Sequence, residues 1–158
     1  MIRRVTVRGV ILHKGKMFCV KQKNEIGEIN DYWCAPGGGL DIGEPIIAGL
    51  ERELYEELGV KPVIGNLAIV MQCINKRGEE RLDMFFHVKN SQDFLAVDLS
   101  KTTHGSHEIS EFGFMDTKTA NILPKVFTEI DFTNIIAGTK PPILLNEIPT
   151  NTTITAQT

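Results

Sequence analysis

The sequence predicts an α+β protein in which helices lie against a mixed β-sheet. Strand-like runs rich in β-branched and aromatic residues recur along the chain, whereas residues 45–58 and 124–137 place apolar residues at helical spacing. With 158 residues, of which 42% are hydrophobic and 23% charged, the composition is that of one ordinary folded domain and excludes a disordered chain. We expect a single domain over residues 1–142 and a tail over residues 143–158.

The N-terminal third predicts strands and turns. Residues 5–12 and 17–23 are strand-like and flank a turn at residues 14–15, which predicts a β-hairpin. The polar residues 24–31 predict a loop, and residues 32–39, YWCAPGGG, lead from a short strand into a glycine-rich turn.

The clearest helix is predicted over residues 45–58. Pro45 suits the first turn of a helix, and Gly59 suits its C-terminal end. The apolar side chains recur at helical spacing and should face the core; they are Ile47, Leu50, Leu54 and Leu58.

The second half predicts two long strands, then a final strand and a second helix. Residues 66–74 and 80–88 flank a turn at residues 75–78, and Phe85 shares a mixed face with Arg81. Residues 108–116 predict the final strand and residues 124–137 the second helix. The composition of the tail is typical of either a frayed end or an edge strand that pairs with a partner, such as a second copy in a homodimer.

Charge and hydropathy narrow the class of protein. A formal net charge of −3 argues against a dedicated nucleic-acid binder. The sequence contains neither an apolar run long enough to span a membrane nor a secretory signal, so we expect a cytoplasmic protein. The cysteines match no metal-ligand spacing, and we expect reduced, buried thiols.

A cluster of acidic residues on the predicted helix is the most informative feature. Glu53, Glu56 and Glu57 stand at i, i+3 and i+4, so their carboxylates project from one side of the helix, roughly 120° from the apolar stripe. Carboxylate oxygens suit hard cations such as Mg²⁺. The alternative is a solvated acidic face balanced by basic neighbours, of which only Arg52 is close enough within the helix.

Residues 38–60 resemble the Nudix box at every position of the motif. The matching sequence is Gly38, five residues, Glu44, seven residues, Arg52-Glu53-Leu54, one residue, Glu56-Glu57, one residue and Gly59-Val60. This resemblance implies a Nudix-like α/β/α sandwich with a mixed β-sheet between helices. It also implies hydrolysis, by water, of a nucleoside diphosphate linked to another moiety, with Mg²⁺ or Mn²⁺ as cofactor.

The same resemblance implies a role for each residue of the box. Glu53, Glu56 and Glu57 would be metal ligands, Arg52 would orient them, and Glu44 would assist that network. Gly38 would form the turn into the helix, where it and Gly39 leave the backbone bare enough to approach a phosphate.

The residue that acts as general base is open among three glutamates. We favour Glu53, because a carboxylate beside the attacking water needs only hydrogen-bond reach. Glu108 and Glu111, late in the chain, are the alternatives for the base or for an additional metal ligand.

Substrate recognition is the least determined property. Trp33 and Phe85 could each stack on a base, and Arg81 shares the strand face of Phe85, although both rings could equally be buried in the sheet. Markers of the ADP-ribose and NADH pyrophosphatase subfamilies are missing, which leaves the small-molecule nucleotide substrate open. Two other functions compete: a Nudix-like domain that binds a nucleotide without cleaving it, and RNA decapping. The intact glutamate triad argues against the first, and the acidic charge balance against the second.

Overall fold

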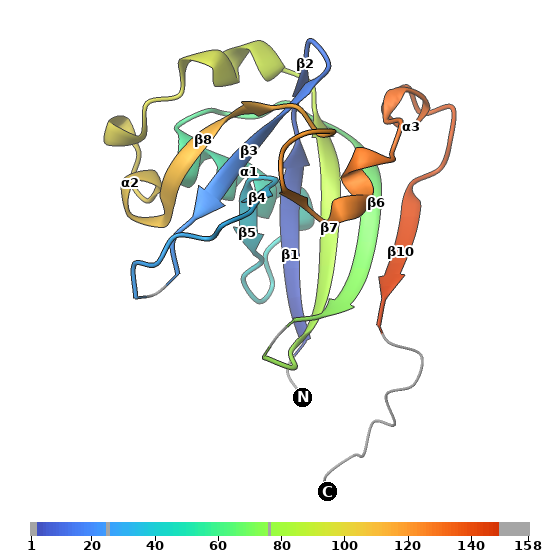
Figure 1. The fold of residues 1–158 in the computed structure, drawn as a ribbon, viewed down its shortest axis with the longest axis horizontal. Coiled ribbons are helices and arrows are strands. Elements are labelled where there is room, and N and C mark those ends of the chain that lie inside the picture. The colour runs from blue at the N-terminus through green and yellow to red at the C-terminus, as the bar shows by residue number, and fades with distance from the viewer. Residues whose placement is uncertain (1–2, 25, 76, 149–158) are drawn as a thin grey trace, which may run out of the picture.

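The structure is a computed structural model that describes residues 3–24, 26–75 and 77–148 (Figure 1). The described strands form two mixed sheets. The first has the order β10 (Ile143–Glu147), β6 (Ile64–Ile74), β7 (Glu80–Val88), β1 (Arg3–Val10) and β5 (Gly37–Gly39). The second has the order β2 (Leu12–His13), β3 (Lys16–Gln22), β4 (Trp33–Cys34) and β9 (Ile122–Leu123), with β8 (Ile109–Met115) also paired to β3. The predicted α+β class is confirmed.

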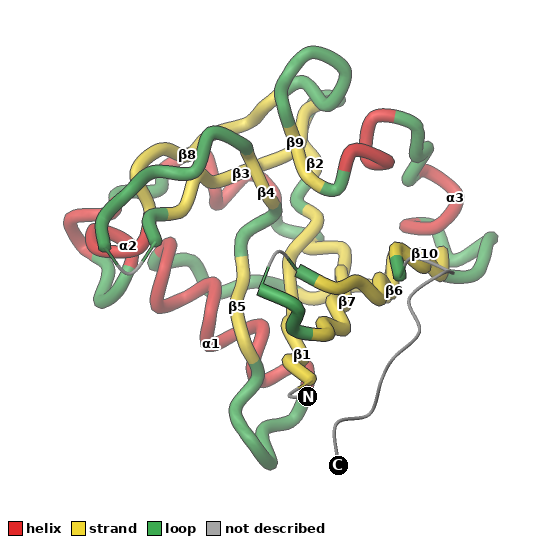
Figure 2. The backbone as a smooth tube through the Cα atoms, turned by 60° about the horizontal axis from the view of Figure 1, so that its bottom comes forward, coloured by secondary structure: helices red, strands yellow, loops and turns green. Residues whose placement is uncertain are grey.

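The helices are few, and most are short. Among the described residues the longest is α1 (Ile46–Leu58), and the others are α2 (Gly105–Glu108), α3 (Thr133–Ile136) and the 3₁₀ segments η1 (Ser91–Ala96), η2 (Leu99–Lys101) and η3 (Lys125–Thr128). Figure 2 shows α1 and α3 on different sides of the first sheet. No helix in the described ranges is long and apolar enough to cross a membrane.

The predicted N-terminal hairpin is wrong in its extent. Strand β1 pairs with β5 in antiparallel and with β7 in parallel orientation, while the hairpin is confined to β2 and β3, where Leu12 lies opposite Met17. The chain passes from one sheet to the other at Ile11, which is fully buried. Alternation of apolar residues continues through this bend, so the sequence pattern did not reveal that the two halves belong to different sheets.

The triple glycine forms strand β5 rather than a simple turn. Gly37 has a φ of 135°, and a Cβ atom there would collide with the backbone carbonyl of Val7. The missing side chain therefore lets β5 lie against β1, opposite residues Thr6, Val7 and Arg8.

Helix α1 agrees with its predicted bounds. Gly59 adopts a left-handed conformation with φ 70°, and its N–H donates to the carbonyl of Tyr55. Leu50 and Leu54 are fully buried, and burial of a side chain of this size contributes about 1.5–3 kcal/mol. Ile47 is 40% exposed, contrary to prediction, so the buried stripe begins one turn later.

The two long strands pair as predicted, in antiparallel orientation, with Val70 opposite Met84. Both faces of β7 are covered. Val88 packs in the cluster that includes α1, whereas Phe85 packs in the opposite cluster, where its ring meets Phe127 edge to face. The strand face predicted as mixed, which carries Arg81 and Phe85, is therefore polar at Arg81 and part of the core at Phe85.

The C-terminal region differs most from prediction. Residues 124–137 form η3 and α3 instead of one helix, because the Asp131 carboxylate accepts a hydrogen bond from the N–H of Thr133 and starts a separate turn. Strand β8 is not the final strand, since β9 and β10 follow it. Strand β10 is an edge strand, but it pairs with β6 of the same chain. Residues 149–158 of the predicted tail, and residue 76 of the predicted turn, lie outside the described residues.

Candidate functional site

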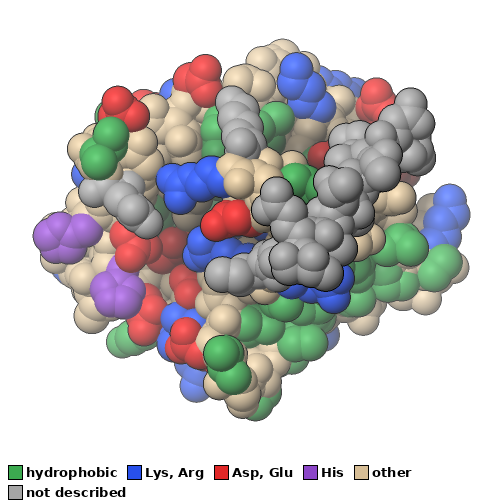
Figure 3. Space-filling view, turned by 90° about the horizontal axis from the view of Figure 1, so that it is seen from below, with side chains coloured by type: hydrophobic (Ala, Val, Ile, Leu, Met, Phe, Trp, Pro, Cys, Tyr) green, Lys and Arg blue, Asp and Glu red, His purple; other side chains and the backbone are tan. Residues whose placement is uncertain are grey.

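A cleft of about 370 Å³ lies between the acidic face of α1 and the adjacent edge of the first sheet. On the molecular face seen in Figure 3, acidic side chains lie beside basic and histidine side chains. The predicted site residues that line this cleft are Gly38, Gly39, Arg52, Glu53, Glu56, Glu57, Arg81 and Glu108. The cleft is also lined by residues that the sequence did not assign to the site, namely Arg4, Thr6, Arg8, Gln22, Gly37 and His104.

Arg52 organises the acidic wall. Its Nε and Nη2 donate to the two carboxylate oxygens of Glu44 at 2.7 and 2.9 Å, and these hydrogen bonds lower the pKa of Glu44 to about 2. Its Nη1 donates to Glu53 at 2.9 Å and to Glu56 at 3.2 Å, and its Nη2 also reaches the carbonyl oxygen of Gly39 at 3.2 Å. One guanidinium thus ties the strand to three carboxylates, with Glu44 as its anchor.

Glu57 lies at the bottom of the acidic wall and is only 2% exposed. Its Oε2 accepts a hydrogen bond from the N–H of Gly37 at 3.3 Å, a donor placed there by the close approach of β5. Burial, together with the nearby charge of Glu53, raises the pKa of Glu57 to about 8. Burial also raises the pKa of Glu53, despite its contact with Arg52. Burial therefore disfavours the ionised forms of Glu53 and Glu57 in the metal-free protein.

The donor set of this wall fits a divalent cation in kind. Within the described ranges, no three His, Cys, Asp or Glu side chains already surround a common point as metal ligands do, and Arg52 engages Glu53 and Glu56. Mg²⁺ is usually bound through one or two carboxylates and keeps several waters, so a complete protein cage is not needed. A cation here would supply the positive charge that buried Glu57 lacks.

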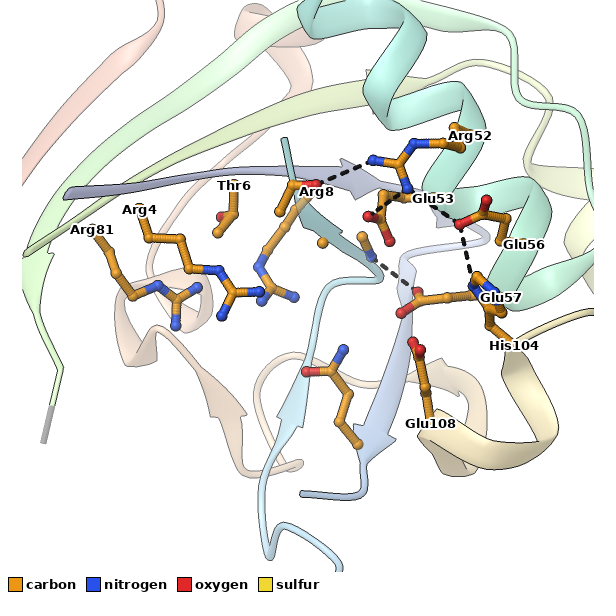
Figure 4. A pocket seen from close by; sticks show the side chains of 14 residues that line it. Arg4, Thr6, Arg8, Arg52, Glu53, Glu56, Glu57, Arg81, His104 and Glu108 are labelled. Carbon is orange, nitrogen blue, oxygen red and sulfur yellow. Dashed lines mark hydrogen bonds and ion pairs between the residues drawn. The ribbon is translucent and has the colours of Figure 1, made fainter. Parts of the chain in front are cut away.

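Arginines form the wall opposite the glutamates, as Figure 4 shows. Arg4 and Arg8 come from alternate positions of β1, and Arg81 lies beside Arg4 in the register of β1 and β7. Arg8 Nη1 donates to the carbonyl oxygen of Ala35 at 2.7 Å, which fixes its position. The alternation of polar residues at positions 4, 6 and 8 indicates a polar strand face. The sequence did not show that this face lies opposite the acidic helix, because the two segments are far apart in the chain.

Arg81 is held in place by a buried acid. Its Nη2 lies 3.1 and 3.2 Å from the two oxygens of Asp83, which is 3% exposed and also accepts a hydrogen bond from the hydroxyl of Thr6. Arg81 Nε is buried and has no hydrogen-bond partner among the described residues. Asp83 thus fixes the orientation of this guanidinium at the edge of the cleft.

The loop before β8 closes one end of the cleft. His104 Nδ1 lies 3.2 Å from Glu56 Oε2, and the N–H of His104 donates to the backbone carbonyl of Glu56. Glu108 lines the cleft, whereas Glu111 is exposed and lies 3.7 Å from Lys21. Of the alternative bases, only Glu108 is therefore brought to the site.

The two aromatic residues predicted to stack on a base do not line this cleft. Trp33 is half-buried against the core, with Lys21 Nζ 5.0 Å from its ring centroid. Phe85 is 1% exposed and packs against Phe127, with ring centroids 5.2 Å apart. Neither ring offers an open face to this cleft, because alternation along a strand turned one away and placed the other in the core.

Comparison with known proteins adds family and fold. The NUDIX domain family model matches residues 2–133. The structure is similar to that of the ORF135 protein of E. coli, with a TM-score of 0.64 and 19% identity over 87% of this chain and 94% of that chain. It is also similar to a UDP-X diphosphatase, with a TM-score of 0.67 and 19% identity over 91% of this chain and 68% of that chain. A MutT NUDIX hydrolase from Burkholderia pseudomallei gives a TM-score of 0.58 and 22% identity over 75% of this chain and 86% of that chain. A search of curated proteins finds no match.

Proposed function

This chain belongs to the Nudix family of hydrolases, which act on phosphoanhydride bonds, and we propose that it is a metal-dependent pyrophosphohydrolase. Its substrate would be a nucleoside diphosphate linked to another moiety. The observation that carries the proposal is the pair of opposed walls in one cleft, with Arg52-bound glutamates facing Arg4, Arg8 and Arg81. An acidic wall suits a cation, and a basic wall suits the phosphates that such a cation would accompany.

In the proposed reaction, water attacks one phosphorus of the pyrophosphate, and the bond from that phosphorus to the bridging oxygen breaks. The attacking water gives up a proton, and the other phosphate leaves. A divalent cation held by Glu53, Glu56 and Glu57 would neutralise phosphate charge and make the attacking water more acidic. The guanidinium groups of Arg8 and Arg81 would hold the phosphates and stabilise the charge that develops on their oxygens.

We propose Glu53 as the general base. Arg52 donates to its Oε1, whereas none of the hydrogen bonds found among the described residues involves its Oε2. A carboxylate oxygen left free in this way is within reach of a water in the cleft. Glu108, the last residue of α2, is the second candidate.

A product-resolved screen tests this function. Purified protein is incubated with nucleoside triphosphates, nucleotide sugars and dinucleotides in Mg²⁺, in Mn²⁺ and in excess EDTA, and the products are separated. We expect a nucleoside monophosphate as product with either metal, and none with EDTA. Glu51→Gln serves as the matched control for Glu53→Gln, because Glu51 lies on the same helix but is exposed and outside the cleft.

Two outcomes would contradict the proposal. Turnover that persists in excess EDTA would exclude the metal-dependent mechanism. Tight nucleotide binding without any turnover would favour the alternative, a Nudix-like domain that binds a nucleotide without cleaving it.

A further inference from the structure

A second pocket, of about 440 Å³, adjoins the cleft on the same face of the first sheet. The two share Arg8, Gln22 and Arg81, so a ligand whose phosphates lie against these arginines can extend directly into the second pocket. This pocket is less polar than the cleft, and its apolar lining includes Met71, Phe85 and Leu123. A volume of this size is typical of sites for small organic ligands, and the lining combines apolar side chains with charged ones.

One wall of this pocket comes from residues that follow the part of the chain matched by the family model. The family model ends at residue 133, whereas Glu147 lies on strand β10 and lines the pocket. The register places Glu147 beside Cys73, and Cys73 beside Arg81, in one row across β10, β6 and β7. Neighbouring strands lie about 4.8 Å apart, so the backbone of Glu147 is roughly 10 Å from that of Arg81. This separation is comparable to the distance between the phosphate and the far edge of the base in a nucleotide.

The charges of the second pocket differ from those of the cleft. Lys125 and Glu147 both line it, and within the described residues neither side chain makes an ion pair or a hydrogen bond. A carboxylate can only accept hydrogen bonds when ionised, and it repels a second anionic group. An uncharged ring that carries N–H donors can donate a hydrogen bond to the Glu147 carboxylate. A second phosphate group at this end of the ligand would be repelled by it.

We propose that the second pocket holds the nucleobase of the substrate, and that Glu147 accepts a hydrogen bond from an amino group of that base. This inference rests on the proposed function, and it narrows the substrate to nucleotides of the amino-bearing bases adenine, guanine or cytosine. Specificity then depends on strand β10, which lies beyond the residues that the family model matches.

The test is a cycle that removes each partner of the proposed hydrogen bond. The wild type and Glu147→Ala are assayed on three pairs that each differ only by the amino group of the base: GTP and ITP, ATP and the purine riboside triphosphate, and CTP and the 2-pyrimidinone riboside triphosphate. UTP is assayed beside them. Glu129→Ala is the control, because Glu129 is an exposed acid that lines neither pocket.

For the preferred pair, loss of the amino group should raise the KM of the wild type about tenfold, with kcat changed less than twofold. Glu147→Ala should raise the KM for the amino-bearing substrate by a similar factor and leave that of its partner unchanged. Equal effects on both substrates, no effect on either, or a preference for UTP would overturn the inference.

A binding measurement separates this inference from the proposed function. Calorimetry in EDTA compares GMP with IMP, or AMP with purine riboside monophosphate, on the wild type, Glu147→Gln and Glu129→Gln. The same pattern in binding without turnover of any nucleotide would support the base pocket and contradict the hydrolase. Turnover with no dependence of binding on Glu147 would contradict the base pocket alone.

Discussion

Replacing Glu57 by Gln should stabilise the metal-free protein while it abolishes activity. Glu57 is 2% exposed, and burial raises its pKa to about 8 from a usual value of 4.5. Between these two pH values the folded state holds a proton that the unfolded state has lost, so the free energy of unfolding decreases as the pH rises. Gln keeps the shape, can still accept the hydrogen bond from Gly37, and has no proton to lose.

The size of the effect follows from the two pKa values. One proton contributes 1.36 kcal/mol per pH unit, and about 2.5 units separate pH 4.5 from pH 7. The wild type and Glu57→Gln should therefore be equally stable near pH 4.5, and the variant should be more stable by up to about 3 kcal/mol at pH 7. The difference should reach its limit above pH 8, where Glu57 is ionised in both states.

Urea unfolding in EDTA at pH 5, 6, 7 and 8 measures this difference. Saturating Mg²⁺ should then stabilise the wild type more than the variant, because only the wild type keeps the full set of ligands. The kcat of the variant should fall by several orders of magnitude. Glu51→Gln, an exposed change on the same helix, should alter stability by about 0.5 kcal/mol or less and leave turnover intact. A stability difference independent of pH, or wild-type turnover by Glu57→Gln, would refute the reasoning.

Three further substitutions test other parts of the site. In steady-state kinetics, Arg52→Lys should lower kcat/KM at least a hundredfold, nearly as far as Arg52→Ala, because an ammonium cannot make the forked contact with Glu44. If Arg52→Lys instead kept the activity, positive charge alone would be sufficient at this position. Gly38→Ala should reduce kcat at least tenfold in single-turnover assays, since a Cβ at this position collides with the Glu53 carboxylate; an unchanged rate would mean that Glu53 can move without loss. Phe85→Ala should lower the free energy of unfolding by about 3–5 kcal/mol in urea melts, through the cavity it leaves in the core; a raised KM with unchanged stability would instead restore its role in base stacking.

The sequence alone was sufficient for features that depend on near neighbours in the chain. The bounds of α1 follow from Pro45 and Gly59, and the common side of Glu53, Glu56 and Glu57 follows from helical spacing. The pairing of β6 with β7 follows from two alternating runs joined by a short turn. In each case the interaction that decides the structure acts over a few residues, so the pattern that predicts it lies within one segment.

Only the tertiary structure decided which distant segments meet. Strand β1 could have paired with its neighbour β3, but it pairs with β5 and β7, and this choice brings Arg4 and Arg8 opposite the glutamates. Packing on both faces of β7 buried Phe85 and kept it out of the cleft, so that it lines the second pocket instead; the return of β10 to β6 brought Glu147 to the same pocket. Alternation along a strand specifies two faces but neither the partner nor the layer that covers each face. The partner strand and the covering layer are set by long-range packing. The acidic wall could therefore be predicted from the sequence, and the basic wall could not.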